Sequence, residues 1–338
     1  IGKLVTDWLR TWGDAAAREE RGKPAGILPT AIHWPDGRVG GVGAKWWLPE
    51  NYTTQLYDFP SAMTLMLNTL ALAAHMTGDK SFVAPLRTMA AARLEWIRAG
   101  RPAAPEGSRL WCAAQLGELG GAIAKYRFVT GDGSLDELLR AERDVPYVQY
   151  RLAGAADAAG LASAFEQLAS VVRVNFPAYT QEVRYTDRVM RFPVLYQPGW
   201  MLERGAPTTI VEAGVMAMGL NRLTLLYHAA TGAPGDPLYF PLNAVRWRTP
   251  PRDIAALVTD AALDRFAAKL YHFGNDERRL GAELLLLKPG SYRYVLSADN
   301  GRKPLQNGSI SITPANRTIS LTLPAHRECA LRIEAGSR

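Results

Sequence analysis

A short phrase of turn residues recurs three times in this 338-residue chain and marks the ends of helices. It reads Thr77-Gly78-Asp79, then Thr130-Gly131-Asp132, and in a looser form Thr231-Gly232 followed by Gly235-Asp236. Glycine readily adopts the left-handed conformation that ends a helix, and an aspartate side chain can cap the helix that follows. Each copy lies between two apolar segments of helical character, so the sequence predicts an array of three helical hairpins.

The helices themselves are predicted from apolar residues at helical spacing. We expect helices over 3–20, 60–76 and 80–100, a hairpin over 110–143, a helix over 158–174, and a third hairpin that starts near 211. Pro237 and Pro241 interrupt the second helix of that last hairpin, because proline is poorly tolerated inside a helix. The segments 21–58 and 176–209 lack a helical period, and loops of this length are usually functional.

Beyond about residue 250 the pattern changes to short segments in which apolar and polar residues often alternate. Strands are predicted at 266–273, 279–287, 291–296, 309–312, 318–323 and 329–333, with turn residues between them. Such a series is typical of an antiparallel β-sandwich. We therefore expect a helical domain over 1–245 and a β-sandwich domain over 246–338.

Composition limits the classes of partner. The chain is 48% hydrophobic and carries a net charge of +7, and it contains no apolar run of the roughly 18 residues that a membrane span needs. The positive charge favours an anionic partner such as an acidic polysaccharide. Nucleic acid is disfavoured because the basic residues are scattered rather than clustered. Cys112 and Cys329 are too few for a disulfide framework or a zinc site, and no cofactor motif is present, so we expect no metal and no cofactor.

Helical hairpins followed by an antiparallel sandwich resemble the polysaccharide lyases with an (α/α) toroid and a C-terminal sandwich, and the related glycoside hydrolases. The resemblance rests on the three turn phrases and on the strand pattern, and it is architectural. It implies a cleft surrounded by inner helices and lined by the loops that join the hairpins. The chain supplies fewer helices than a full toroid of six hairpins, so we expect either a partial toroid or a missing N-terminal portion of the same protein.

The first candidate site segment is the loop 27–58, in which tryptophans and tyrosines alternate with charged and amide side chains. Sugar rings stack on aromatic faces, whereas sugar hydroxyl groups need polar partners. The candidate residues are His33 and Tyr52 for proton transfer, and Trp34, Trp46, Trp47, Asn51 and Tyr57 for substrate binding. The alternative is that Trp46 and Trp47 fill the end of the helical barrel and that His33 is an ordinary polar loop residue.

The second candidate segment is 179–200. Glu182, Arg184 and Arg188 could clamp a substrate, since a guanidinium meets a carboxylate in two parallel hydrogen bonds, and Tyr185 and Trp200 lie in the same segment. The alternative is a salt-bridged hairpin face. Elsewhere, His75 and His228 precede turn phrases, where a favourable interaction with the helix dipole explains them without catalysis.

These observations favour a carbohydrate-active enzyme that cleaves an acidic, uronate-containing polysaccharide or oligosaccharide by β-elimination. In this hypothesis Arg184 or Arg188 binds the uronate carboxylate, His33 or Tyr52 removes the C5 proton, and a second tyrosine protonates the leaving oxygen. A toroid-class glycoside hydrolase and a non-catalytic glycan-binding protein stay open as alternatives. We expect a periplasmic or secreted protein, and the hypothesis requires that the two candidate segments meet at one cleft.

Overall fold

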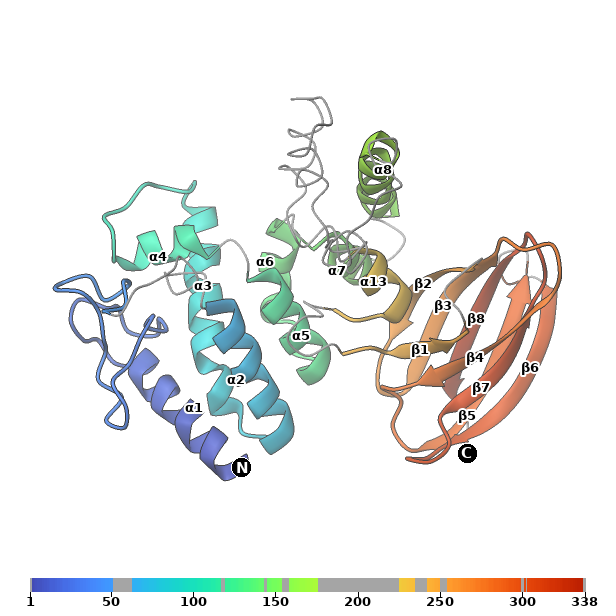
Figure 1. Cartoon of the computed structure of the whole chain (residues 1–338), viewed down its shortest axis with the longest axis horizontal. Coiled ribbons are helices and arrows are strands. Elements are labelled where there is room, and N and C mark those ends of the chain that lie inside the picture. Colours follow the sequence, from blue (N-terminus) through green and yellow to red (C-terminus); the bar gives the residue numbers. More distant parts are fainter. Residues whose placement is uncertain are drawn as a thin grey trace, which may run out of the picture. The chain divides into compact units, whose positions relative to one another are not determined.

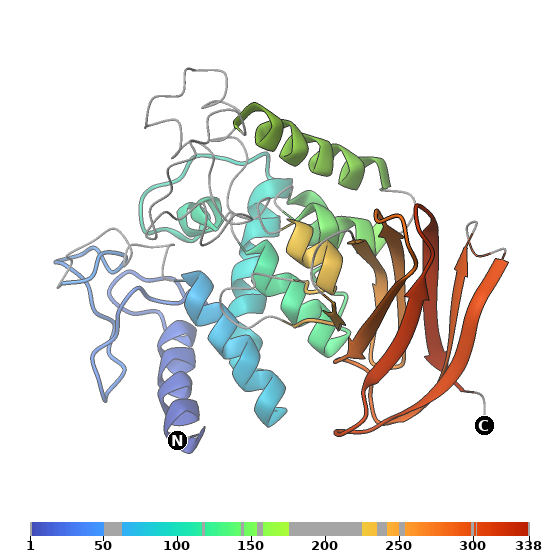
Figure 2. The ribbon, with the colours of Figure 1, turned by 45° about the vertical axis from the view of Figure 1, so that its right-hand side comes forward.

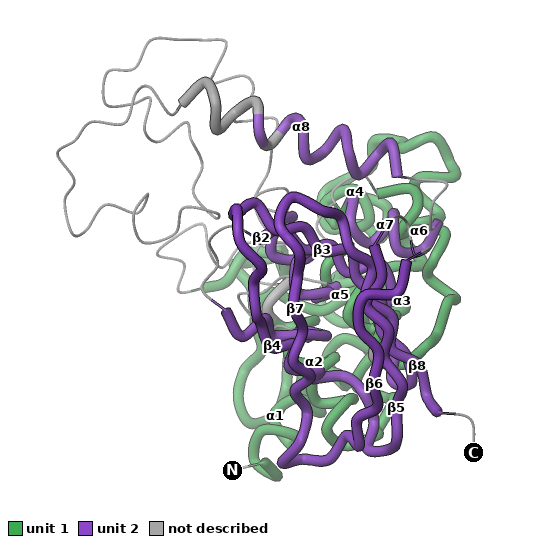
Figure 3. Tube along the Cα trace, turned by 90° about the vertical axis from the view of Figure 1, so that its right-hand side faces the viewer, with its two compact units in different colours: residues 1–145, 238–240 green, residues 146–237, 241–338 purple. Residues whose placement is uncertain are grey.

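The computed structural model describes residues 2–50, 63–116, 119–142, 145–153, 158–175, 225–234, 242–249, 254–298, 301 and 303–336. Helices occupy the N-terminal half and antiparallel sheets the C-terminal part, as the sequence predicts (Figure 1). The chain divides into two compact units, residues 1–145 with 238–240, and residues 146–237 with 241–338 (Figure 3). The predicted boundary between folding domains near residue 245 stays a prediction.

The first unit is built from helices. These are α1 (Gly2–Ala17), α2 (Met63–Thr77), the 3-10 helix η2 (Lys80–Val83), α3 (Ala84–Arg98), α4 (Arg109–Gln115), α5 (Gly120–Thr130) and α6 (Asp136–Ala141). The predicted helices at 3–20 and 60–76 correspond to α1 and α2. The first helix of the second hairpin was expected to be continuous, but α4 ends at Gln115 and α5 begins at Gly120. The sequence offers a reason, because glycines at 117, 120 and 121 disfavour a continuous helix.

The first turn phrase closes α2 as expected. Gly78 has a φ of +74°, and the Thr77 hydroxyl donates a hydrogen bond of 2.7 Å to the carbonyl of Ala73. The backbone N–H of Asp79 donates to that same hydroxyl at 3.1 Å, and the Asp79 carboxylate accepts the N–H of Ser81 at 2.9 Å, which caps η2. Thr77, Gly78 and Asp79 therefore provide hydrogen-bond partners for backbone groups at the end of α2 and at the start of η2.

The second phrase repeats this geometry after α5. Gly131 has a φ of +74°, the Thr130 hydroxyl donates to the carbonyl of Tyr126 at 2.7 Å, and Asp132 accepts the N–H of Ser134 at 2.9 Å. Its aspartate caps the turn rather than α6 itself, whose N-cap residue is Leu135.

The third phrase closes a helix, and the next described element is a strand. Gly232 has a φ of +75°, and the Thr231 hydroxyl donates to the carbonyl of Tyr227 at 2.7 Å, so the helix ends in the same way as at the other two copies. The next element among the described residues is a strand that starts at Val245, and the second helix predicted for this hairpin stays a prediction. Gly235 and Asp236 lie outside the described residues.

The core of the first unit lies between α2, α3, α5 and α6. Leu67 and Leu70 of α2 are fully buried, together with Leu86 and Met89 of α3 and Ile123 of α5. The predicted burial of α2 on several sides agrees with this, because Ala71 and Ala73 are also buried. Closure of these helices into a toroid stays a prediction.

The second unit contains three described helices and all the named strands. The helices are α7 (Pro146–Ala153), α8 (Ala158–Asn175) and α13 (Leu225–Thr231). The sequence predicted α8 but missed α7. Tyr147 of α7 is 1% exposed, and its hydroxyl donates a 2.9 Å hydrogen bond to the carbonyl of Val258 in β2 (Ile254–Ala261). Arg151, one turn later, donates to the carbonyl of Ala261 at 2.8 Å, so α7 is fixed to this strand.

The remaining strands are β1 (Val245–Arg248), β3 (Arg265–His272), β4 (Arg278–Leu284), β5 (Gly290–Ala298), β6 (Lys303–Ile312), β7 (Thr318–Leu323) and β8 (Glu328–Ala335). They form two antiparallel sheets with the orders β1-β4-β7 and β2-β3-β8-β5-β6 (Figure 2). Apolar side chains of both sheets, such as Leu284 and Leu331, belong to one core. The six predicted strands are all present, whereas β1 and β2 were missed.

Candidate functional site

The loop after α1 is ordered by a buried lysine. Lys23 is fully buried, and its ammonium group donates hydrogen bonds to the carbonyls of Ala16, Pro24 and Ile27 at 2.8–3.0 Å. Burial lowers the pKa of Lys23 to about 8, because a charged amine is poorly stabilised away from water. A single side chain thus supplies donors to three carbonyls of a segment that has little regular structure.

Two arginines fix the far side of the same loop. Arg18 donates to the carbonyl of Gly37 at 2.7 Å, and Arg21 donates to the carbonyls of Val39, Gly41 and Gly43. The backbone from 36 to 43 is therefore held against the end of α1, although only isolated bridges occur in it. This matters for function because a site on a fixed loop can hold catalytic geometry.

His33 stands at the start of a turn on this loop. Its N–H donates to the carbonyl of Arg38 at 2.8 Å, and its carbonyl accepts the N–H of Gly37 at 2.8 Å, so the backbone of His33 is fixed. Its side chain is 38% exposed, and Nε2 lies 4.0 Å from Oε1 of Glu50. An accessible imidazole beside a carboxylate is an arrangement suited to proton transfer.

The three tryptophans of this loop have different surroundings. Trp34 is 58% exposed and presents its ring to solvent, whereas Trp46 is 1% exposed. Trp47 is half-buried, and its ring lies 5.8 Å from that of Trp46 and 5.5 Å from that of Trp111. In this conformation Trp46 has no ring face for a sugar, which agrees with the alternative that it fills the interior. Trp34 keeps the exposed surface that stacking requires.

The other predicted site residues lie outside the described residues. These are Asn51, Tyr52 and Tyr57 of the first segment, and Glu182, Arg184, Tyr185, Arg188 and Trp200 of the second. Of the predicted set, the structure brings together His33 and its sequence neighbour Trp34, and adds Glu50 as a partner. Whether the two segments meet stays a prediction.

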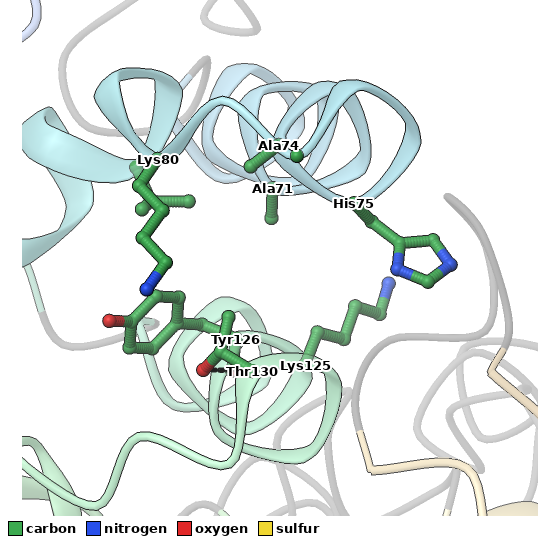
Figure 4. Close-up of a pocket in the computed structure, with 9 residues that line it drawn as sticks. Ala71, Ala74, His75, Lys80, Lys125, Tyr126 and Thr130 are labelled. Atoms are coloured by element: carbon green, nitrogen blue, oxygen red, sulfur yellow. Dashed lines mark hydrogen bonds between the residues drawn. The ribbon is translucent and has the colours of Figure 1, made fainter. Parts of the chain in front are cut away.

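A pocket that the sequence did not predict lies in the first unit between α2, η2 and α5. It has a volume of about 220 Å³, and its polar lining comes from His75, Lys80, Lys125 and Tyr126 (Figure 4). Gly78 and Thr130 of two turn phrases are also part of the wall, so the C-terminal ends of both helices meet there. The repeated phrase was the signal that could have found it, since both copies face the same cavity.

Tyr126 is engaged in a hydrogen bond at this pocket. Its hydroxyl donates to the carboxylate of Asp132. Burial, reinforced by the carboxylate, raises the pKa of Tyr126, while the Tyr126 hydroxyl lowers the pKa of Asp132 to about 2. Tyr126 therefore stays neutral and Asp132 ionised over the physiological pH range.

Within the described ranges, no group of three or more His, Cys, Asp or Glu side chains is arranged to hold a metal ion. No helix in the same residues has the length and apolar character to cross a membrane.

Comparisons with known proteins do not assign this chain to a family. No protein-family model and no curated protein matches the sequence. Among solved structures, a candidate alpha-N-acetylgalactosaminidase from Bacillus halodurans C-125 matches over 40% of this chain and 26% of its own length, with 12% sequence identity and a TM-score of 0.20. A likeness of this size carries no conclusion about fold or activity.

Proposed function

We propose that this chain is a carbohydrate-active enzyme that cleaves an acidic, uronate-containing polysaccharide or oligosaccharide by β-elimination. The observation that carries the proposal is the placement of His33 4.0 Å from Glu50, directly beside the exposed Trp34, on a loop fixed by buried donors. The helical hairpins and the two sheets with a shared core support the toroid and sandwich architecture that underlies it.

The proposed chemistry assigns each group one role. Glu50 lies on the Nε2 side of His33, so the opposite ring nitrogen, Nδ1, accepts the proton from C5 of the uronate. The electron pair of that C–H bond forms the C4–C5 double bond as the C4–O bond breaks, and Tyr52 or Tyr185 gives its proton to the leaving oxygen. Arg184 or Arg188 neutralises the uronate carboxylate, which makes the C5 proton more acidic. Trp34 stacks on the neighbouring sugar.

Digestion of a panel of uronate polymers by residues 1–338 tests the proposal. We expect ultraviolet absorbance from an unsaturated uronide to grow together with reducing ends. His33→Gln should lower kcat/KM by about 10²–10⁴-fold, the usual contribution of a general base. His326→Gln is the matched control, because His326 is an exposed histidine of the second unit, and it should leave the rate unchanged.

Other outcomes would decide between the alternatives. Reducing ends without the ultraviolet signal would replace elimination by hydrolysis. Binding of polymers without any product, from wild type and His33→Gln alike, would make the chain a glycan-binding protein. Because polymers of this kind lie outside the cytoplasm, we propose a periplasmic or secreted location, which fractionation of the source cells would test.

A further inference from the structure

The pocket between α2 and α5 has the size of a site for one small molecule. Its volume of about 220 Å³ lies below the range of about 300–1,000 Å³ for pockets that hold drug-sized ligands, so its occupant is smaller than these. Ala71, Ala74 and Val83 form an apolar part of the wall. A single ring with an apolar face fits these dimensions and this surface.

The lining of the pocket is electropositive. The described residues that line it include Lys80 and Lys125, and none of these described residues is an aspartate or glutamate. In Figure 4 the amine of Lys80 extends over the pocket beside the ring of Tyr126, and the amine of Lys125 points toward His75 on the other side. Asp132 lies next to the pocket, but its charge is engaged by the Tyr126 hydroxyl and by Ser134. The ammonium group of Lys80, which extends over the pocket, therefore favours an anionic ligand.

The helix ends offer a competing explanation, in which the cations serve only the negative ends of the helix dipoles. Two carbonyls near the end of α2, however, already have donors. Ala73 and Ala74 accept from the Thr77 hydroxyl and from the Gly78 N–H, at 2.7 and 2.9 Å.

At the end of α5, the Tyr126 carbonyl accepts from the Thr130 hydroxyl at 2.7 Å, and the Arg127 carbonyl accepts from the Gly131 N–H at 3.0 Å. Moreover, Lys80 and His75 form no hydrogen bond or ion pair within the part of the chain that the structure describes. The charge of Lys80 and the hydrogen-bonding capacity of both side chains are therefore open to a ligand.

We infer that this pocket binds a small organic carboxylate of about the size of one sugar ring, with Lys80 engaging the carboxylate, His75 on the other side of the pocket engaging a hydroxyl group of the ring, and the alanines contacting the apolar face of the ring. The source is either a free sugar acid or a uronate unit of a longer chain. This binding does not require the proposed cleavage reaction, because His33 and Glu50 take no part in it.

Titration calorimetry of residues 1–338 with glucuronate, glucose and inorganic sulfate tests the inference. Glucuronate should bind about tenfold tighter than glucose, since one charged hydrogen bond contributes on that order. A di- or trisaccharide of uronates that binds more tightly than the monomer assigns the pocket to the polymer, and equal affinity assigns it to a free acid. Equal affinity for glucose and glucuronate, or a sulfate affinity that matches glucuronate, would overturn the inference.

Two variants probe the site from different directions. Lys80→Gln removes an exposed charge and should weaken glucuronate binding about tenfold, whereas Lys3→Gln, at an exposed lysine of α1, should not change it. Ala74→Leu fills the pocket with a good helix former and should abolish binding, and Ala91→Leu on the exposed side of α3 is its control.

Unchanged affinity in both Lys80→Gln and Ala74→Leu would place any binding elsewhere and refute the assignment. His33→Gln separates this inference from the proposed reaction. It should lower the cleavage rate by about 10²–10⁴-fold and leave glucuronate affinity as in wild type, so failure of the proposed reaction is distinguishable from failure of the proposed binding site.

Discussion

Two arginine–glutamate pairs connect the same two helices of the first unit, and they should differ sharply in their contribution to stability. Arg93 of α3 pairs with Glu142, the C-cap residue directly after α6, with a distance of 2.7 Å between Nε and Oε1. The two side chains are 8% and 10% exposed. Arg98 of α3 pairs with Glu137 of α6, but there the side chains are 59% and 54% exposed.

The change Glu142→Ala leaves a guanidinium buried without its carboxylate. Arg93 keeps the carbonyls of Ala113 and Ala114, at 3.0 and 2.9 Å, and the ring of Trp96, 4.6 Å away, but no negative charge among these groups. Removing one partner of a buried pair costs about 3–5 kcal/mol of unfolding free energy. A typical domain has only about 5–15 kcal/mol in total, so the loss should be large.

The exposed pair is the matched control. Glu137→Ala removes the same residue type from the same helix, but water screens the remaining charge of Arg98, and we expect a loss of about 1 kcal/mol or less. The double change Arg93→Met with Glu142→Leu should cost less than Glu142→Ala alone, because it removes the stranded charge.

Urea denaturation followed by tryptophan fluorescence measures these differences. Seven of the nine tryptophans lie within residues 1–145, so the signal reports mainly on the first unit. The midpoint should fall for Glu142→Ala at an unchanged slope, which indicates a change in stability rather than in the unfolded state. Equal losses for Glu142→Ala and Glu137→Ala would refute the assignment of this energy to burial.

Local geometry gives three further predictions. Tyr147→Phe should lower the unfolding free energy of the second unit by about 1–3 kcal/mol, because it leaves a buried carbonyl of β2 without its donor, and thermal denaturation would show it. Gly107→Ala should destabilise the protein far more than Gly100→Ala. Both positions have a positive φ, but a Cβ at Gly107 would lie 2.2 Å from the Trp47 ring, whereas a Cβ at Gly100 would meet open space. Equal melting temperatures for the two variants would contradict this prediction. Burial raises the pKa of the Cys112 thiol to about 12, which lowers its thiolate fraction at pH 8 by about a thousandfold. Cys112 should therefore react with iodoacetamide only after unfolding, and peptide mass spectrometry would measure this reaction.

Local signals predicted the parts of the fold that local chemistry controls. The phrase at Thr77 and its copy at Thr130 specify their own hydrogen bonds within a few residues, so they could be read without knowledge of the tertiary structure. Several of the six predicted strands had the period-two alternation that the two faces of a sheet impose. These elements are independent of distant partners.

The missed elements depend on distant contacts. Strand β2, with the sequence IAALVTDA, is rich in alanine and lacks strict alternation, because α13 and Tyr147 of α7 also pack against it. Strand β1 has only four residues and is defined by its pairing with β4. Helix α7 has only eight residues, and its buried Tyr147 depends on distant partners in β2, α8 and α13.

In the candidate site, too, local sequence predicted some features, whereas features that depend on distant contacts were missed. The composition of the loop pointed to His33 and Trp34, but nothing local could show that Trp46 is interior and Trp34 is not, since burial depends on what the rest of the unit packs against the ring. The pocket was missed because its wall joins helices about 50 residues apart, and Lys80 and Lys125 carry no motif.

Strand β8 holds a central place in the larger sheet, between β3 and β5, although it is the last strand in sequence. The hairpins β2–β3 and β5–β6 can each form from neighbouring residues, yet each would expose an unpaired edge until β8 arrives to join them. Closing the segment between β3 and β8 costs entropy before its contacts are gained, which slows assembly. A chain that ends before Glu328 would therefore expose an unpaired strand edge on each hairpin. Chains in this state could associate through these edges, so addition of β8 after synthesis protects the protein against aggregation.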